Sequence, residues 1–422
     1  MAKYDVVVVG GGHNGLIAAA YLAKAGLDVC IIERQDKVGG GVITRELTLP
    51  GFKDEPGSIV HGFIQLNPLL ANDELKLKSK YGLNYIHDEG VQVASLLPDD
   101  RALFLWKDVD KTCESIEQFS RKDAEAYHRL QEIATGAAQM MTAGMFEPPV
   151  PFGEMMSLLD GMGEDGQEIL RIMLASAIDV CNEWFESEEV KVALSRFATE
   201  LCFMPQEQGT GANMVFFIGL GHLGVFAYGR GGSGALADAL ERCLKDLGAT
   251  IRTSTSVKRI KVEGGEAKGV VLDTGEEVSA RKAVISNLNV KQLFLQMLEA
   301  EELPDNFQAK VRRIKPSAYS AIHQALALNE APKYKAGGEL NRSTFIQFNL
   351  LPMDDYLRVF EDLSHGVPRT DIPLAACATL IDPTRAPKGK HTLYLLHFAP
   401  YRLKEGPAKW DEIKQEVADG VL

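Results

Sequence analysis

Apolar residues open the chain in a pattern that predicts two buried strands joined by a helix. Val6 to Val9 form an uninterrupted β-branched run, which favours a strand buried on both faces, as in a parallel sheet. The segment from Leu16 to Ala25 is rich in Ala and Leu and predicts a helix that ends at Gly26. Val29 to Ile32 is a second short apolar run. The order strand, helix, strand predicts an α/β fold.

Further periodic segments predict helices and strands along the rest of the chain. We expect helices at 121–141, 164–185, 187–203, 236–247 and 352–363, and strands at 91–96, 102–106, 225–228, 283–287, 319–328 and 343–349. Two tight returns between 262 and 278 predict a three-stranded antiparallel insert. The apolar, proline-broken segment 146–159 has three interpretations: a flap over an apolar tunnel, a surface that dips into a membrane, or an ordinary loop that covers the core.

The loop after the first strand has the glycine spacing of a dinucleotide-binding site. Gly10, Gly12 and Gly15 fit G-x-G-x-x-G, with the strand before it and the helix after it. In that motif the glycines permit the tight turn, the approach of a pyrophosphate and close helix–strand packing, and the helix N-terminus faces the phosphates. Glu33 follows the second strand and is expected to accept hydrogen bonds from ribose hydroxyls. The alternative is a glycine-rich turn of another α/β protein.

A second glycine cluster favours FAD over NAD as the cofactor. Val38-Gly39-Gly40-Gly41 comes a few residues after Glu33 and is followed by Arg45. Flavin enzymes with two such clusters run backbone along both the pyrophosphate and the ribityl chain, whereas an NAD dehydrogenase has no need of the second. The sequence therefore predicts FAD as the cofactor.

Composition narrows the class of protein. The 422 residues carry a net charge of −13, which argues against nucleic-acid partners. The six cysteines are scattered without a C-x-x-C, as expected of reduced thiols in an intracellular protein, and we expect a cytoplasmic location. We expect no metal site, no signal peptide and no transmembrane helix. The sequence leaves open a peripheral membrane association and a homo-oligomer.

Two motifs near the N-terminus resemble a known flavoprotein family. E-R-x-x-x-V-G-G-G and H-N-G-L-I-A-A-A-Y-L-A-K-A-G are similar to the FAD-binding start of the phytoene desaturase and amine oxidase superfamily. The resemblance extends to the carotenoid ketolase-like, phytoene-dehydrogenase-related branch, which holds the pyridine nucleotide-disulfide oxidoreductase domain-containing proteins. The block 229–236 and the D-P-x-x-A-P-x-G-x-H loop at 382–391 also resemble this branch.

The resemblance implies an architecture and a set of cofactor contacts. It implies a Rossmann-like FAD-binding domain of glutathione-reductase type (1–70 and 215–290) with an interleaved α+β substrate domain (71–214 and 291–422). The family ends in a glycine-rich strand–helix unit that closes over the flavin, and no such unit precedes Leu422, so retention of FAD is an open question. The implied cofactor-binding residues are Gly10, Gly12, His13, Asn14, Gly15, Glu33, Arg34, Gly40, Gly41, Val42, Arg45, Val257, Ser286 and Asn287.

The hypothesis for function is an FAD-dependent oxidoreductase of the desaturase or dehydrogenase type. It would act on an apolar isoprenoid-like or alicyclic small molecule by hydride transfer to the flavin. Two alternatives stay open: a flavin amine oxidase, and a non-catalytic nucleotide-binding relative that acts through partners. Without a nucleophile–base motif, His61 and Arg45 are catalytic candidates only through their expected proximity to the flavin, and His61 has a purely structural interpretation as well.

Overall fold

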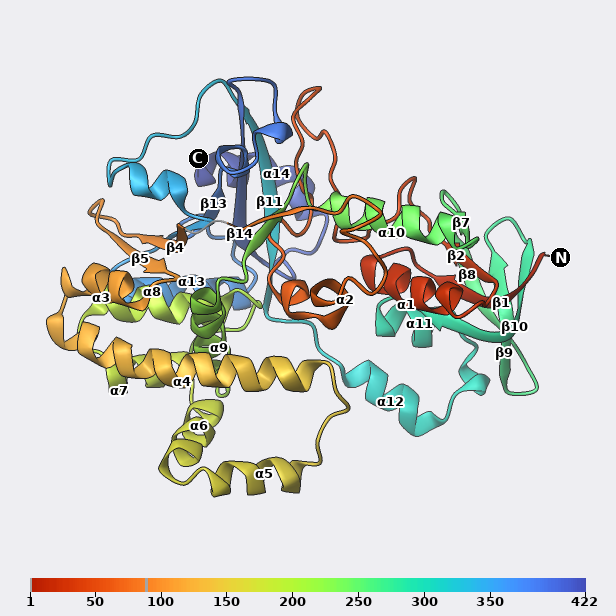
Figure 1. Ribbon diagram of the computed structural model, residues 1–422, viewed down its shortest axis with the longest axis horizontal. Helices are drawn as coiled ribbons and strands as arrows, with labels where there is room; N and C mark the ends of the chain where they lie inside the picture. Colours follow the sequence, from red (N-terminus) through yellow and green to blue (C-terminus); the bar gives the residue numbers. More distant parts are fainter. Residues whose placement is uncertain (1, 88–89) are drawn as a thin grey trace.

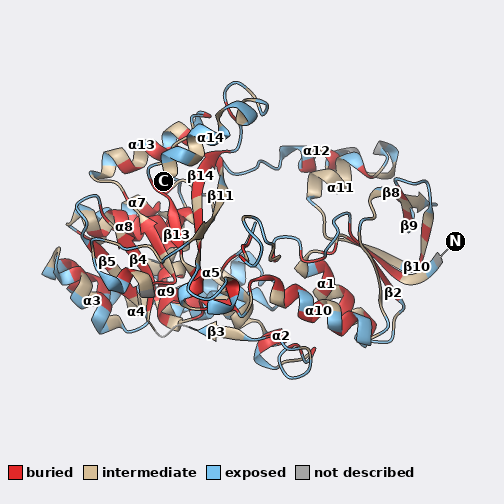
Figure 2. Ribbon diagram, turned by 90° about the horizontal axis from the view of Figure 1, so that it is seen from above, coloured by how far each residue is buried: buried red, intermediate tan, exposed pale blue. Residues whose placement is uncertain are grey.

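Two six-stranded sheets organise the protein, and a different set of helices packs against each (Figure 1). The computed structural model describes residues 2–87 and 90–422. The sheet that contains the N-terminal strand lies on the right of Figure 1, and the other lies on the left beneath the chain's end. The buried residues form separate cores around the two sheets (Figure 2).

The first sheet is parallel on one side and antiparallel on the other. Its strands are, in spatial order, β7 (Thr250–Arg252), β2 (Val29–Ile32), β1 (Ala2–Val9), β10 (Glu277–Ser286), β9 (Glu266–Leu272) and β8 (Val257–Glu263). The first four pair in parallel, and β9 and β8 continue the sheet antiparallel. The three-stranded antiparallel insert is therefore made by β8, β9 and β10, as the sequence predicts.

Both faces of β1 are buried, which confirms the prediction from its valine run. Val6 and Val8 face α1 (His13–Lys24) and α10 (Gly234–Asp246), while Val7 and Val9 face a second core. That second core includes Met297, which follows α11 (Val290–Gln296). The predicted domain boundary at 290 thus lies ahead of a segment that packs on the first sheet.

The second sheet is assembled from distant parts of the chain. In spatial order it contains β11 (Tyr319–Leu328), β14 (His391–Pro400), β13 (Leu374–Ala376), β12 (Phe345–Phe348), β4 (Val91–Leu96) and β5 (Ala102–Trp106). Among the described strand pairs of this sheet, only β12 and β4 are parallel. The β4–β5 hairpin has the bounds that the sequence predicts. A small pair, β3 (Tyr85–His87) and β6 (Ala227–Gly229), lies between the sheets.

A layer of helices packs against the second sheet. It comprises α3 (Val109–Glu117), α4 (Arg121–Met145), α6 (Glu164–Leu174), α7 (Ala177–Trp184), α8 (Glu188–Thr199) and α9 (Thr210–Leu223), with α13 (Met353–Ser364) and α14 (Lys409–Val421) elsewhere on the domain. The helix predicted over 164–185 is two helices, because the Ser176 side chain caps a new N-terminus at α7 and forms a capping box with Asp179. A Cβ at Gly219 would lie 2.2 Å from the Ala134 carbonyl oxygen, so glycine permits α9 to pack directly on α4.

The proline-broken segment 146–159 contains a helix and is not an ordinary loop. It leads into α5 (Phe152–Gly161), which projects from the helical layer at the bottom of Figure 1. Short helices α2 (Pro68–Ala71) and α12 (Asp305–Arg313) lie along the connections between the two domains. Among the described residues, no helix combines the length and the apolar character needed to cross a bilayer. All six cysteines lie in the described ranges and are unpaired.

Candidate functional site

The two glycine loops pack on each other at the carboxyl end of β1. Gly10 has a φ of +95°, and a Cβ at Gly15 would lie 2.4 Å from the Gly10 carbonyl oxygen, so α1 can begin only against glycine. The Gly39 N–H donates to the Gly11 carbonyl at 2.7 Å, and a Cβ at Gly40 would lie 2.9 Å from the Gly12 Cα. The second glycine cluster therefore brings its backbone directly against the first.

The N-terminus of α1 is open to an anion. Gly12 occupies the N-cap position and has no side chain to bond the first N–H groups of the helix. These groups and the positive end of the helix dipole favour a phosphate at this position. A side chain at residue 12 would have to displace the Asn287 side chain, because its Cβ would lie 2.6 Å from the Asn287 amide nitrogen.

Glu33 is held in a fixed orientation by backbone N–H groups. It follows β2 and is 8% exposed. Its Oε2 accepts from the Gly11 N–H at 2.7 Å, and its Oε1 accepts from the Gln35 N–H at 2.8 Å. A carboxylate offers about four acceptor positions, so lone pairs are left for the hydroxyls of a ribose. The group is suited to an adenosine without needing to move.

A cavity of about 720 Å³ connects these groups. Of the cofactor-binding residues expected from the sequence, it is lined by Gly10, Gly12, His13, Asn14, Glu33, Arg34, Gly40, Gly41, Arg45, Val257 and Asn287. The remaining three do not line it. Gly15 packs against the Gly10 carbonyl on the inner side of the glycine loop. Val42 is buried in the core between α1 and α10. The Ser286 hydroxyl accepts a hydrogen bond from the Leu288 N–H. The individual FAD contacts of all these residues stay predictions.

The cavity also includes residues that the sequence did not single out. Thr255, Ser256, Gln292 and Met297 line it from the segments before β8 and after β10. Gln292 and Met297 belong to a stretch that the sequence assigned to the substrate domain. The only signal for them was the strand–turn–helix pattern after residue 283, which repeats the order found after β1. The size and chemistry of the cavity fit a dinucleotide: glycine backbone at one end and a ribose acceptor beyond it.

A second, apolar cavity of about 330 Å³ lies mainly against the second sheet and its helices. Its walls come from the segment 58–63, from α8 and α9, and from the face of the second sheet. The lining includes Val60, Phe63, Val93, Phe197, Phe217, Leu220, Phe226, Phe345, Leu374 and Leu396. Its polar lining residues are Ser58, Glu200, Gln347 and Tyr394. An apolar cavity with a few polar groups is the usual form of a site for a small organic molecule.

His61 lies between the two cavities. It lines a third cavity of about 300 Å³, which shares His13 and Asn14 with the dinucleotide cavity and Val60 and Phe63 with the apolar one. The His61 Nδ1 is 2.7 Å from the Tyr85 hydroxyl, while its buried Nε2 has no partner among the described residues. Burial lowers the pKa of His61 to about 4, so the ring is neutral at pH 7.

Arg45, the other catalytic candidate, lies on the dinucleotide side. It lines the first cavity and neither of the other two. Its Nη2 forms an ion pair with the Asp36 Oδ1 at 2.5 Å, and both side chains are partly exposed. This position suits contact with a cofactor more than with an apolar substrate. The catalytic role of both residues stays a prediction.

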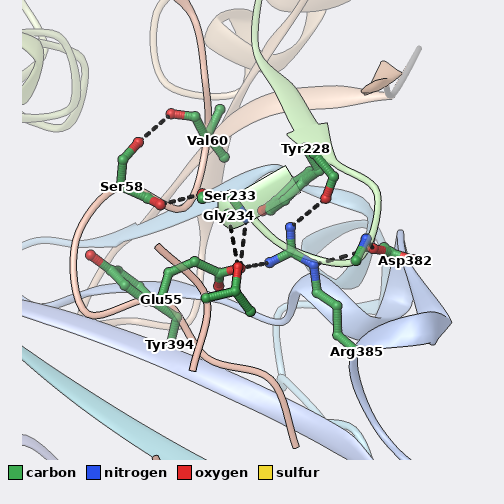
Figure 3. Close-up of polar contacts among 12 residues, drawn as sticks. Glu55, Ser58, Val60, Tyr228, Ser233, Gly234, Asp382, Arg385 and Tyr394 are labelled. Carbon is green, nitrogen blue, oxygen red and sulfur yellow. Dashed lines mark hydrogen bonds and ion pairs between the residues drawn. The ribbon is translucent and has the colours of Figure 1, made fainter. Parts of the chain in front are cut away.

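A buried ion-pair cluster fixes the segment that separates the cavities (Figure 3). Arg385 comes from the D-P-x-x-A-P-x-G-x-H loop and is fully buried. Its Nη1 pairs with Glu55 at 2.8 Å, its Nε pairs with Asp382 at 3.3 Å, and its Nη2 donates to the Gly229 carbonyl at 3.0 Å. The pattern of residues in this loop indicates no role by itself. In the structure, the cluster joins the loop to the segment before Ser58 and to the loop after β6.

The same cluster holds the start of α10. The Ser233 N–H donates to Glu55 at 3.1 Å, and the Gly231 N–H donates to Asp382 at 2.6 Å. The Ser233 hydroxyl donates to the Ser58 carbonyl (Figure 3). The Tyr394 hydroxyl donates to the Gly57 carbonyl at 3.3 Å. Residues 55–60 are thus held from both domains. Among the described residues, no group of His, Cys, Asp and Glu is arranged to hold a metal ion.

Comparison with known proteins supports one family. A model of the flavin-containing amine oxidoreductases matches residues 15–417. The chain is 30% identical to the pyridine nucleotide-disulfide oxidoreductase domain-containing protein 2 of Rattus norvegicus, over 100% of this chain and 78% of the relative. It is 26% identical to a limonene dehydrogenase polypeptide of Castellaniella defragrans, over 99% of this chain and 77% of that relative.

Solved structures agree on the fold. An oxidoreductase from Methanosarcina mazei superimposes with a TM-score of 0.60 at 21% identity, covering 99% of this chain and 83% of that one. The resemblance to the phytoene desaturase family, the Rossmann-like FAD-binding fold and the expectation of FAD are confirmed by these findings.

Proposed function

The chain belongs to the flavin-containing amine oxidoreductase family, and we propose that it is a dehydrogenase or desaturase of a small apolar isoprenoid-like or alicyclic molecule. The observation that carries this proposal is the apolar cavity, whose walls are mainly aromatic and aliphatic side chains. Limonene dehydrogenase, among the relatives, bears the name of such a substrate. The protein itself is an FAD-dependent oxidoreductase, as its family is.

The cavity suggests a limit on substrate size. Sites for small organic ligands usually have volumes of about 300–1,000 Å³, so a cavity of about 330 Å³ lies at the lower end of that range. A ten-carbon cyclic terpene fits this volume. A forty-carbon polyene would have to leave most of its length outside the cavity. We therefore propose a substrate closer in size to a monoterpene than to a carotenoid.

Different residues around the cavities have different roles in the proposed reaction. When bound, FAD supplies the acceptor for a hydride. The aromatic walls formed by Phe197, Phe226 and Phe345 orient an apolar substrate and exclude water. The segment 58–63 follows Glu55, which Arg385 holds in place, and it would lie between the substrate and the bound cofactor. The neutral ring of His61 offers an unpartnered Nε2 beside the cofactor loop residues His13 and Asn14.

The exposed apolar side chains near α5 support a route by which an apolar substrate reaches the site. Met145 and Phe146 line the His61 cavity and are 50% and 36% exposed, and Phe152 and Leu158 on α5 are 73% and 58% exposed. We propose that this surface contacts a membrane peripherally. Co-sedimentation with phosphatidylcholine vesicles should be lost in a Phe152→Asp/Leu158→Asp variant. If both proteins stay in the supernatant and the wild type elutes as a dimer, the surface is a self-association site instead.

The function is tested by the flavin and its reduction. The purified protein should show the visible absorption of bound flavin. Under anaerobic conditions, limonene or another cyclic terpene should bleach that absorption, and an aliphatic diamine should not. Phe217→Trp, which fills the apolar cavity, should abolish the bleaching without changing the flavin content. Bleaching by the diamine alone would favour the amine oxidase alternative, and no bleaching by any donor would favour the non-catalytic one.

A further inference from the structure

The apolar cavity contains one carboxyl group among its described lining residues. Glu200 follows the last residue of α8 and faces the cavity between Phe197 and Gln347. Its side chain is 20% exposed. A carboxyl in such surroundings is costly, because desolvation disfavours its charged form. An apolar residue at this position would line the cavity at a lower cost in stability, so the carboxyl calls for an explanation other than packing.

One oxygen of Glu200 is fixed by a side chain of the second sheet. The Gln347 Nε2 donates to the Glu200 Oε1 at 3.0 Å. Gln347 lies on β12 and is itself buried, and its Oε1 accepts from the Ser95 hydroxyl at 3.4 Å. The Ser95 bond orients the amide so that its NH₂ group faces Glu200. The carboxyl group therefore has a fixed direction within the cavity.

The buried side chain of Arg196 approaches the same oxygen, Glu200 Oε1. The Arg196 Nε is 3.8 Å from the Glu200 Oε1, and the guanidinium stacks on the Phe398 ring and donates to the Ile372 carbonyl. Both contacts of Glu200 thus involve Oε1. Among the described residues, no hydrogen-bond donor contacts Oε2, so this oxygen of the cavity-lining carboxyl has no partner there.

Two opposing effects act on the charge of Glu200. Burial raises the pKa of its carboxyl, while Arg196 and the Gln347 amide lower it. The other titratable groups near it are Cys202, Tyr319, Tyr356 and Tyr394, whose pKa values burial also raises, so they stay neutral at pH 7. Burial is the larger effect, so the pKa of the Glu200 carboxyl is raised overall, which is the direction that favours proton uptake by a general base.

We propose that Glu200 is the catalytic base, which takes a proton from the substrate through its Oε2. The proposal rests on the proposed function. Desaturation breaks two C–H bonds on adjacent carbons. One hydrogen leaves with its electron pair to FAD, the other leaves as a proton to Glu200, and the electron pair left behind forms the C=C bond. Gln347 and Arg196 act as positioning residues for the carboxylate.

The test compares Glu200→Gln with the wild type in three measurements. Flavin content and the dissociation constant for limonene, followed by the change in flavin absorption, should stay within threefold of the wild type. The anaerobic rate of flavin reduction should fall by roughly 10²–10⁴-fold, the usual contribution of a positioned base. Glu200→Asp should restore part of that rate. The control is Glu207→Gln, which changes an exposed glutamate between α8 and α9. It should leave the flavin content, the dissociation constant and the reduction rate unchanged.

If the Glu200→Gln variant does not fold, a second variant still tests the role of Glu200. Gln347→Met removes the donor to Oε1, so the pKa of Glu200 should rise and the limb of the rate–pH profile that reports the base should move to higher pH. A wild-type rate in Glu200→Gln, or an unmoved profile in Gln347→Met, overturns the role of Glu200. If no apolar donor reduces the wild-type flavin, the proposed function fails instead, and the two failures are thereby distinguished.

Discussion

Replacing Arg385 with methionine should destabilise the protein by about 3 kcal/mol at pH 8. Methionine has a similar length but no donor, so it removes the ion pairs to Glu55 and Asp382 and the hydrogen bond to the Gly229 carbonyl. Both carboxyls are buried, with exposures of 2% and 0%. Loss of one partner of a buried ion pair costs about 3–5 kcal/mol, because a charge is left without compensation.

The two carboxyls should contribute unequally to this loss. Asp382 keeps three donors after the substitution: the N–H of Gly231 and both the N–H and the hydroxyl of Thr384. Of the described residues, only the Ser233 N–H still donates to Glu55. Most of the destabilisation therefore comes from Glu55, which places the expected value at the lower end of the range.

The destabilisation should depend on pH in a direction that the structure fixes. Burial raises the pKa of Glu55, and Arg385 opposes that rise. Without the guanidinium the folded-state pKa rises further above the unfolded value. A carboxyl with a raised pKa contributes stability that is full below its unfolded pKa and is lost as the pH rises through its folded pKa. The penalty of Arg385→Met should thus be small near pH 5 and largest near pH 8.

Urea unfolding followed by far-ultraviolet circular dichroism, at pH 5 and pH 8, measures both effects. Arg281→Met is a matched control, because Arg281 also bridges two carboxylates and donates to a backbone carbonyl, yet it is 40% exposed. Its loss should cost less than about 1 kcal/mol. A second change, Glu55→Gln, should recover part of the stability of Arg385→Met. A loss below about 1 kcal/mol in Arg385→Met, or the same loss at both pH values, would refute the reasoning.

Three further outcomes are expected. Gly12→Val should abolish flavin uptake, because its Cβ would meet the Asn287 amide at 2.6 Å, whereas Gly136→Ala, with open space around it, should retain one flavin per chain on absorption spectroscopy. Glu33→Ala should weaken FAD binding by about 1–3 kcal/mol in a fluorescence titration of the apoprotein, and an unchanged affinity would mean that Glu33 does not contact the ribose. Because burial lowers the pKa of His61 to about 4, its stabilising contribution is present above the unfolded value of about 6.5 and is lost as the pH falls toward 4. Between pH 7 and pH 4.5, the free energy of unfolding measured with urea should therefore fall by up to about 3 kcal/mol less in His61→Gln than in the wild type. An equal fall in both proteins would contradict the assignment.

The nucleotide-binding half could be predicted because its signals are local. Val6 to Val9, the glycine spacing and Glu33 lie within one βαβ unit, so their geometry follows from neighbours in sequence. Helix α9 carries no such signal, since it is apolar all round and lacks the polar face that marks an amphipathic helix. The division between α6 and α7 depended on a single cap at Ser176.

The apolar cavity and its carboxyl could not be found from the sequence. The walls combine segment 58–63 with α8, α9 and four strands of the second sheet, and only tertiary folding brings these together. Glu200 follows an amphipathic helix in which a single Glu indicates nothing beyond a solvated surface. Arg385 and Glu55 are 330 positions apart, so their ion pair left no local pattern.

The place of β1 inside its sheet has a consequence during protein synthesis. One edge of β1 pairs with β2, which follows it closely, but the other edge pairs with β10. β1 ends at Val9 and β10 begins at Glu277, so about 270 residues must leave the ribosome before that edge is covered, which takes roughly 15–50 s. Throughout this time the nascent chain presents an unpaired valine-rich edge, the kind of surface that recruits other strands. A chain released early, before residue 286, would keep that edge permanently, so ribosome stalling in the second domain should yield aggregates that involve the N-terminal strand.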